Sequence, residues 1–180
     1  MSSQKAVFLD RDGTVCEEAN YLSRPEDLRL YPFSVDALRI FRQNGFQIVI
    51  VTNQSGIGRG FFDEKTLGLI HRKLTADLLR EGLQVDGIYY CPHSPKDDCA
   101  CRKPRTGLIE RAKLELKIDL GQSWMIGDKA SDIETGFNAG MGTGLVFTGY
   151  GKTEAEKLRR EPDLTGKNLF EIAEKINMMD

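Results

Sequence analysis

Apolar residues recur along this chain with two different spacings, and the two spacings alternate from one segment to the next. Short runs rich in Val, Ile, Phe and Tyr are typical of buried strands, whereas apolar residues three and four positions apart are typical of amphipathic helices. The short runs predict strands at 5–9, 46–51, 85–90, 124–126 and 144–147. The helical spacing predicts helices at 34–44, 63–81, 108–116, 132–139 and 167–178.

Residues at the ends of the helical segments support these boundaries. Asp63 stands where an N-cap side chain is expected, and Gly82 follows the same segment as a stop signal. Gly45 has the same place after the first helical segment. The highly charged stretch 151–162 has no such pattern, so we expect a solvated linker or a surface helix there.

Strands and helices that alternate at these lengths predict parallel β-α units. The expected fold is therefore α/β, a Rossmann-like open parallel sheet with helices on both faces. At 180 residues, of which 40% are hydrophobic and 29% charged, residues 1–180 are expected to form a single domain. In such folds, ligands bind beyond the carboxyl ends of the strands.

Charge and hydropathy indicate which classes of partner the protein is not expected to bind. The net charge is −2 and the basic residues are scattered, so we expect no nucleic-acid partner. No apolar run approaches the ~20 residues that cross a bilayer, so we expect no membrane association. The start, MSSQKAVFLD, lacks the apolar core of a signal peptide, and a cytoplasmic location is expected. Without an apolar interface stripe, we expect a monomer.

Polar residues follow the predicted strands. FLDRDGT closes the first strand, VTNQSG the second and MIGDKASD the fourth, while CRKP lies in the loop after the third. In a parallel sheet these segments all leave from one edge, so they are expected to line one pocket. The residues gathered there would be Asp10, Asp12, Thr52, Asn53, Gln54, Ser55, Arg102, Lys103, Asp128, Lys129 and Asp132.

This set indicates phosphoryl transfer. Facing carboxylates repel one another unless a cation lies between them, and oxygen ligands suit Mg²⁺. A carboxylate can also attack phosphorus and form an aspartyl phosphate. Lys103 would stabilise the phosphate and the charge of Asp10, and the Thr52 hydroxyl would bind equatorial oxygens. Each piece alone is weak, because Asp is common in turns and at helix N-caps; the ordered set carries the hypothesis.

A second cluster combines cysteine and histidine. Cys91, His93, Cys99 and Cys101 offer three thiolates and one imidazole within eleven residues, a ligand set typical of a closed structural zinc site. The C-x-C spacing does not match the C-x-x-C of redox proteins. We therefore predict a zinc-binding loop at 91–101. Because Arg102 and Lys103 follow directly, zinc would also fix where these two cations point.

Four other residues carry weaker signals. His71 lies on a predicted amphipathic helix and is expected to be a surface or boundary residue without a role. Cys16 is interpreted as a small, partly buried side chain and Trp124 as core. Arg59, among the glycines of GIGRG, is either a contact for a distal phosphate or an exposed loop residue.

The motifs FLDRDGT, VTNQSG, CRKP and GDKASD resemble the four signatures of the haloacid dehalogenase-like phosphatase superfamily. NYLSRPEDLRLYPF, TNQSGIGRGFF and the Cys/His cluster narrow the resemblance to the family shared by heptose-bisphosphate and histidinol-phosphate phosphatases. The first two of these segments favour the heptose substrate. The resemblance covers residues 6–149 and implies a phosphoric monoester hydrolase that acts on a small phosphorylated sugar. A non-catalytic zinc module is the alternative from another class.

The resemblance also implies roles for individual residues. Asp10 would be the nucleophile, and Asp12 would protonate the leaving oxygen and then activate water. Mg²⁺ would be held by Asp10, the Asp12 main-chain carbonyl and Asp128. Asn53, Arg102 and Lys103 would orient the phosphate, with Lys103 also catalytic. Substrate contacts would come from Arg11, Glu18, Ala19, Asn20, Tyr21, Thr52, Asn53, Gln54, Ser55, Arg102, Lys103 and Lys129.

The distances between the motifs limit what can cover the pocket. Residues 13–51 have room for a flap, one helix and one strand, and residues 56–101 for one helix, one strand and the Cys/His loop. Neither interval can contain a folded cap domain. We therefore expect a capless, open site whose specificity comes from short loops.

Overall fold

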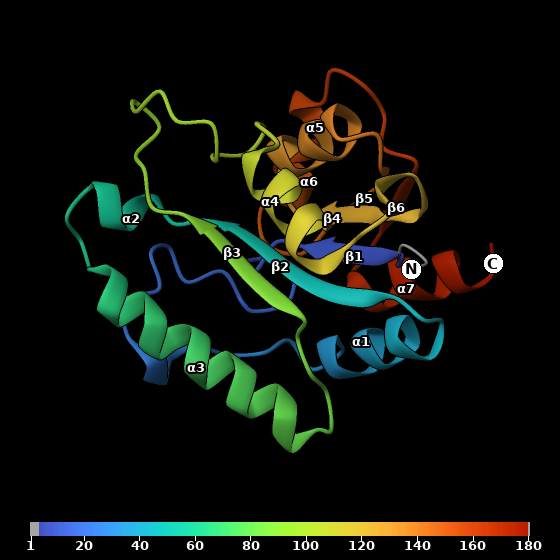
Figure 1. Cartoon of the computed structure of the whole chain (residues 1–180), viewed down its shortest axis with the longest axis horizontal. Coiled ribbons are helices and arrows are strands. Elements are labelled where there is room, and N and C mark those ends of the chain that lie inside the picture. The colour runs from blue at the N-terminus through green and yellow to red at the C-terminus, as the bar shows by residue number, and fades with distance from the viewer. Residues whose placement is uncertain (1–3, 180) are drawn as a thin grey trace.

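The computed structural model describes residues 4–179 and contains a sheet of six parallel strands in the order β3-β2-β1-β4-β5-β6 (Figure 1). This arrangement confirms the predicted α/β class. The strands are β1 (Ala6–Leu9), β2 (Gln47–Asn53), β3 (Gly87–Cys91), β4 (Trp124–Gly127), β5 (Gly142–Val146) and β6 (Leu164–Gly166).

Helices cover both faces of the sheet, as expected (Figure 1). One face carries α1 (Ser34–Gln43), α3 (Glu64–Arg80) and α7 (Leu169–Asn177), and the other carries α4 (Gly107–Leu116) and α5 (Ala130–Asn138). Alternate strand residues divide between the two cores. In β1, Val7 packs with the α1, α3 and α7 side, while Phe8 packs with the α4 side.

Shorter elements fill the connections. Two short helices, α2 (Ser55–Gly58) and α6 (Gly151–Glu154), follow β2 and β5. Single 3₁₀ turns occupy the remaining loops at Pro25–Asp27, Leu120–Gln122 and Ala155–Lys157. The charged stretch 151–162 thus contains surface helical turns, one of the two forms expected for it.

The predicted strands and long helices are all present, with ends shifted by at most two residues. The Asp63 carboxylate accepts a hydrogen bond from the Thr66 N–H at 2.8 Å and so caps α3 as expected. The sequence did not predict β6 or α2, because three or four residues are too short to show a period. The intervals between motifs contain only these elements, so the fold is capless.

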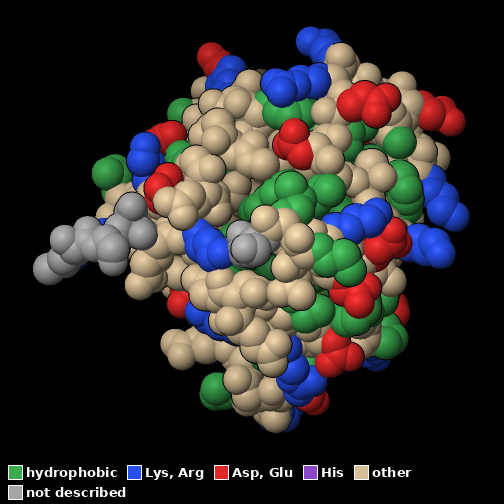
Figure 2. Space-filling view, turned by 90° about the vertical axis from the view of Figure 1, so that its right-hand side faces the viewer, with side chains coloured by type: hydrophobic (Ala, Val, Ile, Leu, Met, Phe, Trp, Pro, Cys, Tyr) green, Lys and Arg blue, Asp and Glu red, His purple; other side chains and the backbone are tan. Residues whose placement is uncertain are grey.

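None of the helices described has both the length and the apolar character needed to span a bilayer. On the face that Figure 2 shows, basic and acidic side chains are interspersed, with apolar side chains among them. This mixing agrees with the nearly balanced totals of 25 basic and 27 acidic residues.

Two leucines of α3 offer a direct test of the packing. Leu74 is fully buried against the sheet, whereas Leu79, five positions along, is 63% exposed. We expect Leu74→Ala to lower the free energy of unfolding by about 2–5 kcal/mol, because it leaves a cavity in the core. The matched Leu79→Ala change should stay within about 0.5 kcal/mol of the parent in urea unfolding. Equal effects of the two changes would contradict the placement of α3.

Candidate active site

Three carboxylates meet at the carboxyl ends of the central strands. Asp10 follows β1, Asp128 follows β4, and Asp132 lies in the first turn of α5. One carboxylate oxygen of each lies within 4.8 Å of the others, and all three side chains are buried. The expected convergence of Asp10 and Asp128 is therefore present in the fold, and Asp132 joins them.

Within the described part of the chain, only one of the two carboxylate oxygens of Asp128 accepts a hydrogen bond. Its Oδ2 accepts a hydrogen bond from the Tyr150 N–H at 2.8 Å, whereas Oδ1 is buried, has no hydrogen-bond partner among the described residues and lies 3.8 Å from Lys129 Nζ. Burial and the Asp10 carboxylate raise the pKa of Asp128 to about 8. A buried carboxylate oxygen without a donor, beside another carboxylate, is what a cation would neutralise. The all-oxygen donor set fits Mg²⁺.

Lys103 neutralises the rest of the acidic cluster. Its Nζ lies 2.9 Å from Asp10 Oδ1 and 2.7 Å from Asp132 Oδ1, and it also donates to the Val51 carbonyl at 2.7 Å. Burial would raise the pKa of Asp10, but Lys103 and Lys129 lower it below its ordinary value. Burial would likewise lower the pKa of Lys103, yet Asp10 and Asp132 hold it above its ordinary value. Asp10 is thus an ionised carboxylate in a buried position.

Asp132 received no role from the sequence. Besides pairing with Lys103, its carboxylate accepts the Lys129 N–H at 3.0 Å through Oδ2. It thereby orients two cations of the site. Its place in the GDKASD motif, four residues after Asp128, had put it at this edge of the sheet, but not in contact with Lys103.

Asp12 lies two residues beyond Asp10 and is held by neutral and charged donors. Arg11 donates from Nε to Oδ1 at 3.0 Å and from Nη2 to Oδ2 at 2.8 Å. Gln54 donates from Nε2 to Oδ2 at 3.0 Å and to the Thr52 hydroxyl at 2.8 Å. Both carboxylate oxygens are therefore fixed in place.

A cavity of about 300 Å³ opens above these residues, and a smaller cavity of about 30 Å³ at its inner end reaches Asp10, Thr52 and Asp132. The larger cavity is lined by Asp12, Glu18, Asn20, Tyr21, Asn53, Gln54, Ser55, Gly56, Arg102, Lys103, Lys129, Ser131 and Tyr150. Ten of these were predicted site residues. Gly56, Ser131 and Tyr150 were not: Gly56 and Ser131 lie within the quoted motifs VTNQSG and MIGDKASD but received no role, and Tyr150 lies outside every motif.

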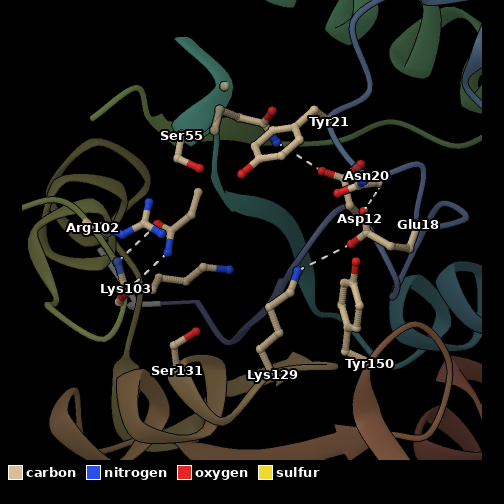
Figure 3. Close-up of a pocket in the computed structure, with 13 residues that line it drawn as sticks. Asp12, Glu18, Asn20, Tyr21, Ser55, Arg102, Lys103, Lys129, Ser131 and Tyr150 are labelled. Carbon is tan, nitrogen blue, oxygen red and sulfur yellow. Dashed lines mark hydrogen bonds and ion pairs between the residues drawn. The ribbon is translucent and has the colours of Figure 1, made fainter. Parts of the chain in front are cut away.

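Cations and polar groups face one another across this cavity. Figure 3 shows Arg102 and Lys103 on one side and Glu18 and Tyr21 on the other, with Lys129 between them. The Lys129 Nζ lies 3.5 Å from Glu18 Oε2. Three basic side chains around one polar cavity are suited to a dianionic phosphate.

Asn53 holds the loop that carries two of these cations. Its side-chain amide donates to the Lys103 carbonyl at 3.2 Å and accepts from the Lys103 N–H at 3.1 Å. The side chain therefore fixes the end of β2 to the CRKP loop.

Three residues predicted to contact substrate do not line the larger cavity with their side chains. The Arg11 side chain is fully buried and points to Asp12 and His71, so its guanidinium is not available to substrate. Ala19 does not line either cavity. Thr52 lines only the inner cavity, where its hydroxyl accepts a hydrogen bond from Gln54.

His71 is a further correction. His71 is half-buried, as expected for a boundary residue, but its Nε2 lies 3.1 Å from Arg11 Nη1, a contact that the sequence did not predict. Burial and the nearby guanidinium lower the pKa of His71 to about 4. Cys16, expected to be partly buried, is fully buried. Helical spacing alone could not show that α3 turns His71 toward the loop after β1.

The flap between β1 and α1 forms one wall of the cavity. Asn20 and Tyr21 have positive φ angles of 44° and 71°. The Tyr21 ring meets Phe61 edge to face, with ring centroids 4.9 Å apart, and Arg59 lies over the same ring at 5.9 Å. This contact joins the flap to the loop after α2. Arg59 does not line the cavity.

The four predicted zinc ligands come together beside this cavity. The Cys91 Sγ lies 3.6 Å from Cys99 Sγ and 3.5 Å from His93 Nδ1, and His93 Nδ1 lies 3.3 Å from Cys101 Sγ. Ligands about 2.0–2.3 Å from a common tetrahedral centre lie at separations of this size. The donor set and its geometry therefore fit a structural zinc ion.

The Cys/His loop also supports two walls of the cavity. Arg102 donates from Nη1 to the His93 carbonyl at 3.3 Å. The Gly58 N–H of α2 donates to the Pro92 carbonyl at 2.8 Å, and a Cβ at Gly58 would lie 2.6 Å from the Ser94 nitrogen. The loop thus positions α2 as well as Arg102.

The fold and the acidic cluster define a hydrolase of the haloacid dehalogenase-like class, and comparison with known proteins agrees. A family model described as HAD-hydrolase-like matches residues 100–172. A Helicobacter pylori D-glycero-beta-D-manno-heptose-1,7-bisphosphate 7-phosphatase is 41% identical over 148 residues, covering 82% of this chain and 86% of that protein. The D-glycero-alpha-D-manno-heptose-1,7-bisphosphate 7-phosphatase of Photorhabdus laumondii is 38% identical and covers 96% of each chain.

A solved structure is similarly close. The D,D-heptose 1,7-bisphosphate phosphatase from B. bronchiseptica, complexed with magnesium and phosphate, superposes with a TM-score of 0.91 at 34% identity, covering 98% of this chain and 99% of that one. The chain therefore belongs to the family of heptose-1,7-bisphosphate 7-phosphatases.

Gly149 makes room for the Asp128 carboxylate, and this can be tested. The residue has φ +53°, and a Cβ there would lie 2.2 Å from Asp128 Oδ2. We expect Gly149→Ala to displace Asp128 and to weaken Mg²⁺ binding, measured by titration calorimetry, as well as to destabilise the fold in urea. Gly140→Ala is the matched control, because φ is +70° but nothing lies within 4 Å. Gly140→Ala should show only the backbone cost of about 1 kcal/mol and normal Mg²⁺ binding.

Removal of one zinc ligand tests the Cys/His cluster. We expect one zinc ion per chain by elemental analysis, and its loss in Cys99→Ser together with a lower melting temperature, since a structural zinc contributes to folding. Cys16→Ser, a buried cysteine outside the cluster, should keep the metal. A metal-free protein of full stability would contradict the zinc site.

Proposed function

We propose that this protein hydrolyses the C7 phosphate of D-glycero-D-manno-heptose 1,7-bisphosphate, using Mg²⁺ and an aspartyl-phosphate intermediate. The reaction would belong to the synthesis of nucleotide-activated heptose. One observation carries the proposal: an ionised, buried Asp10 lies with Lys103 at the inner end of a cation-lined cavity. The names of the relatives in the same family supply the sugar.

Asp10 has one oxygen held by Lys103, which leaves the other for attack on phosphorus. As the new P–O bond forms, the bond to the sugar oxygen breaks, and Asp12 donates a proton to that leaving oxygen. Asp12 then accepts a proton from the water that hydrolyses the aspartyl phosphate. Arg102 and Lys129 would hold the phosphate oxygens, and Lys103 would offset the charge that develops on them.

Asp10, the Asp12 main-chain carbonyl and Asp128 would hold the magnesium ion. The ion would supply positive charge that brings the anionic phosphate close to the anionic carboxylate. The orphaned Oδ1 of Asp128 supports this assignment.

The flap and the α2 loop would set the choice of substrate. Glu18, Asn20 and Tyr21 on one wall and Gln54 and Ser55 on another present hydrogen-bonding groups to a polyhydroxylated sugar. We propose that the protein acts as a monomer, because the sequence has no apolar interface stripe. The four cysteines are free of disulfides, which suits a reducing cytoplasm.

Phosphate release from a panel of substrates tests the function. We expect the largest kcat/KM with heptose 1,7-bisphosphate, release of one phosphate per molecule, and loss of activity after chelation of Mg²⁺ that is regained on addition of Mg²⁺. Histidinol phosphate and hexose monophosphates should be turned over at least about tenfold less efficiently, because they lack the second phosphate or the extended sugar. Preferential turnover of histidinol phosphate would replace the proposed substrate.

Asp10→Asn is the matched control for this assay. The amide keeps the shape of the side chain but has no nucleophilic oxygen anion, so we expect turnover to be abolished. Circular dichroism should show a folded protein. Retained turnover would remove Asp10 as the nucleophile.

A further inference from the structure

A chain of hydrogen bonds runs from the active site into the core on the α3 side. It begins at the Asp12 carboxylate, continues through the fully buried Arg11 guanidinium, and ends at His71 of α3. The three side chains come from the loop after β1 and from a helix sixty residues further along the chain. Neither Arg11 nor His71 lines the cavity.

The direction of each bond follows from the chemistry of the groups. A guanidinium has only donors, so the Nε2 of His71 must accept the bond from Arg11 Nη1. The proton of the neutral imidazole then resides on Nδ1. The lowered pKa of His71, about 4, agrees with this neutral form. Because His71 accepts the hydrogen bond from Nη1, the guanidinium presents its Nε and Nη2 donors to Asp12.

The same bonds leave the two oxygens of Asp12 unequal. Oδ2 accepts from both Arg11 Nη2 and Gln54 Nε2, whereas within the described residues 4–179 Oδ1 accepts only from Arg11 Nε. Each carboxylate oxygen has two acceptor sites, so Oδ1 retains a free one. Oδ1 is therefore the oxygen on which a proton can reside.

We propose that His71 is a positioning residue for the acid–base step: through Arg11 it fixes the Asp12 carboxylate so that Oδ1 donates the proton to the leaving sugar oxygen. This inference rests on the function proposed above, in which Asp12 protonates that oxygen. Without an acceptor at His71, the buried Nη1 of Arg11 loses its partner and the guanidinium turns to find another. The Asp12 carboxylate then loses its bidentate support and its orientation.

The leaving group separates this role from a general effect on the fold. A sugar alkoxide needs protonation as it leaves, whereas p-nitrophenolate leaves without it. We expect His71→Leu to slow release of the sugar in the first turnover by about 10- to 100-fold with KM unchanged. Release of p-nitrophenolate from p-nitrophenyl phosphate in the first turnover should change less than about twofold.

Two amide variants sharpen the test and cover the case in which His71→Leu does not fold. In His71→Gln the side-chain carbonyl reaches the position of Nε2, so we expect sugar release within about threefold of the parent. In His71→Asn the carbonyl reaches only as far as the position of Nδ1. We therefore expect sugar release to be slowed as much as in His71→Leu, with p-nitrophenolate release unchanged. Leu79→Ala, an exposed change further along the same helix, should behave as the parent enzyme.

Asp12→Asn is measured in parallel. We expect its rate of sugar release in the first turnover to fall about 10²–10⁴-fold and its rate of p-nitrophenolate release to fall little. If Asp12→Asn shows this pattern while every His71 variant matches the parent, or slows both substrates equally, the inference is wrong and the proposed function stands. If Asp12→Asn retains normal sugar release, the acid–base role of Asp12 fails, and the role of His71 fails with it.

Discussion

The Lys103 ammonium, buried between Asp10 and Asp132, is the interaction on which the site depends. The three groups are almost completely removed from water, and a charge without a partner there would be very unfavourable. Each therefore requires the other two, and each comes from a different segment: the loop after β1, the CRKP loop and the start of α5. Their mutual attraction thus locks three connections of the sheet into one arrangement. Asp128 lies outside this trio, and with its pKa raised to about 8 it would need the charge of a metal ion to stay ionised.

Much of this arrangement followed from local patterns in the sequence. The strands of the central sheet are short runs rich in apolar residues, and the polar residues after them could be assigned to one edge because parallel strands end together. The Cys/His spacing likewise predicted ligands that the fold does bring together. These predictions succeeded because both chemistry and spacing are encoded within a few adjacent residues.

What the sequence could not give was the direction of individual side chains. Arg11 stands between two catalytic candidates, and only the fold shows that its guanidinium turns inward to Asp12 and His71. His71 belongs to a helix whose rotation about its axis depends on packing against the flap and the sheet. The strand β6 was missed because three residues at a sheet edge carry no recognisable period. Long-range packing, not local propensity, decides each of these features.

The flap forms only one wall of the cavity, and an aromatic contact between Tyr21 and Phe61 joins it to the loop after α2. In enzymes that enclose an intermediate beneath a mobile domain, water can be kept out while a second acceptor takes the phosphoryl group. A rim of this small size would leave the cavity open, so that water could enter beside the buried Asp10 once the sugar has left. The fate of a phosphorylated aspartate would then be set by the concentration of solvent, which favours hydrolysis over transfer to another sugar. The absence of a cap would thus commit this architecture to the irreversible removal of phosphate.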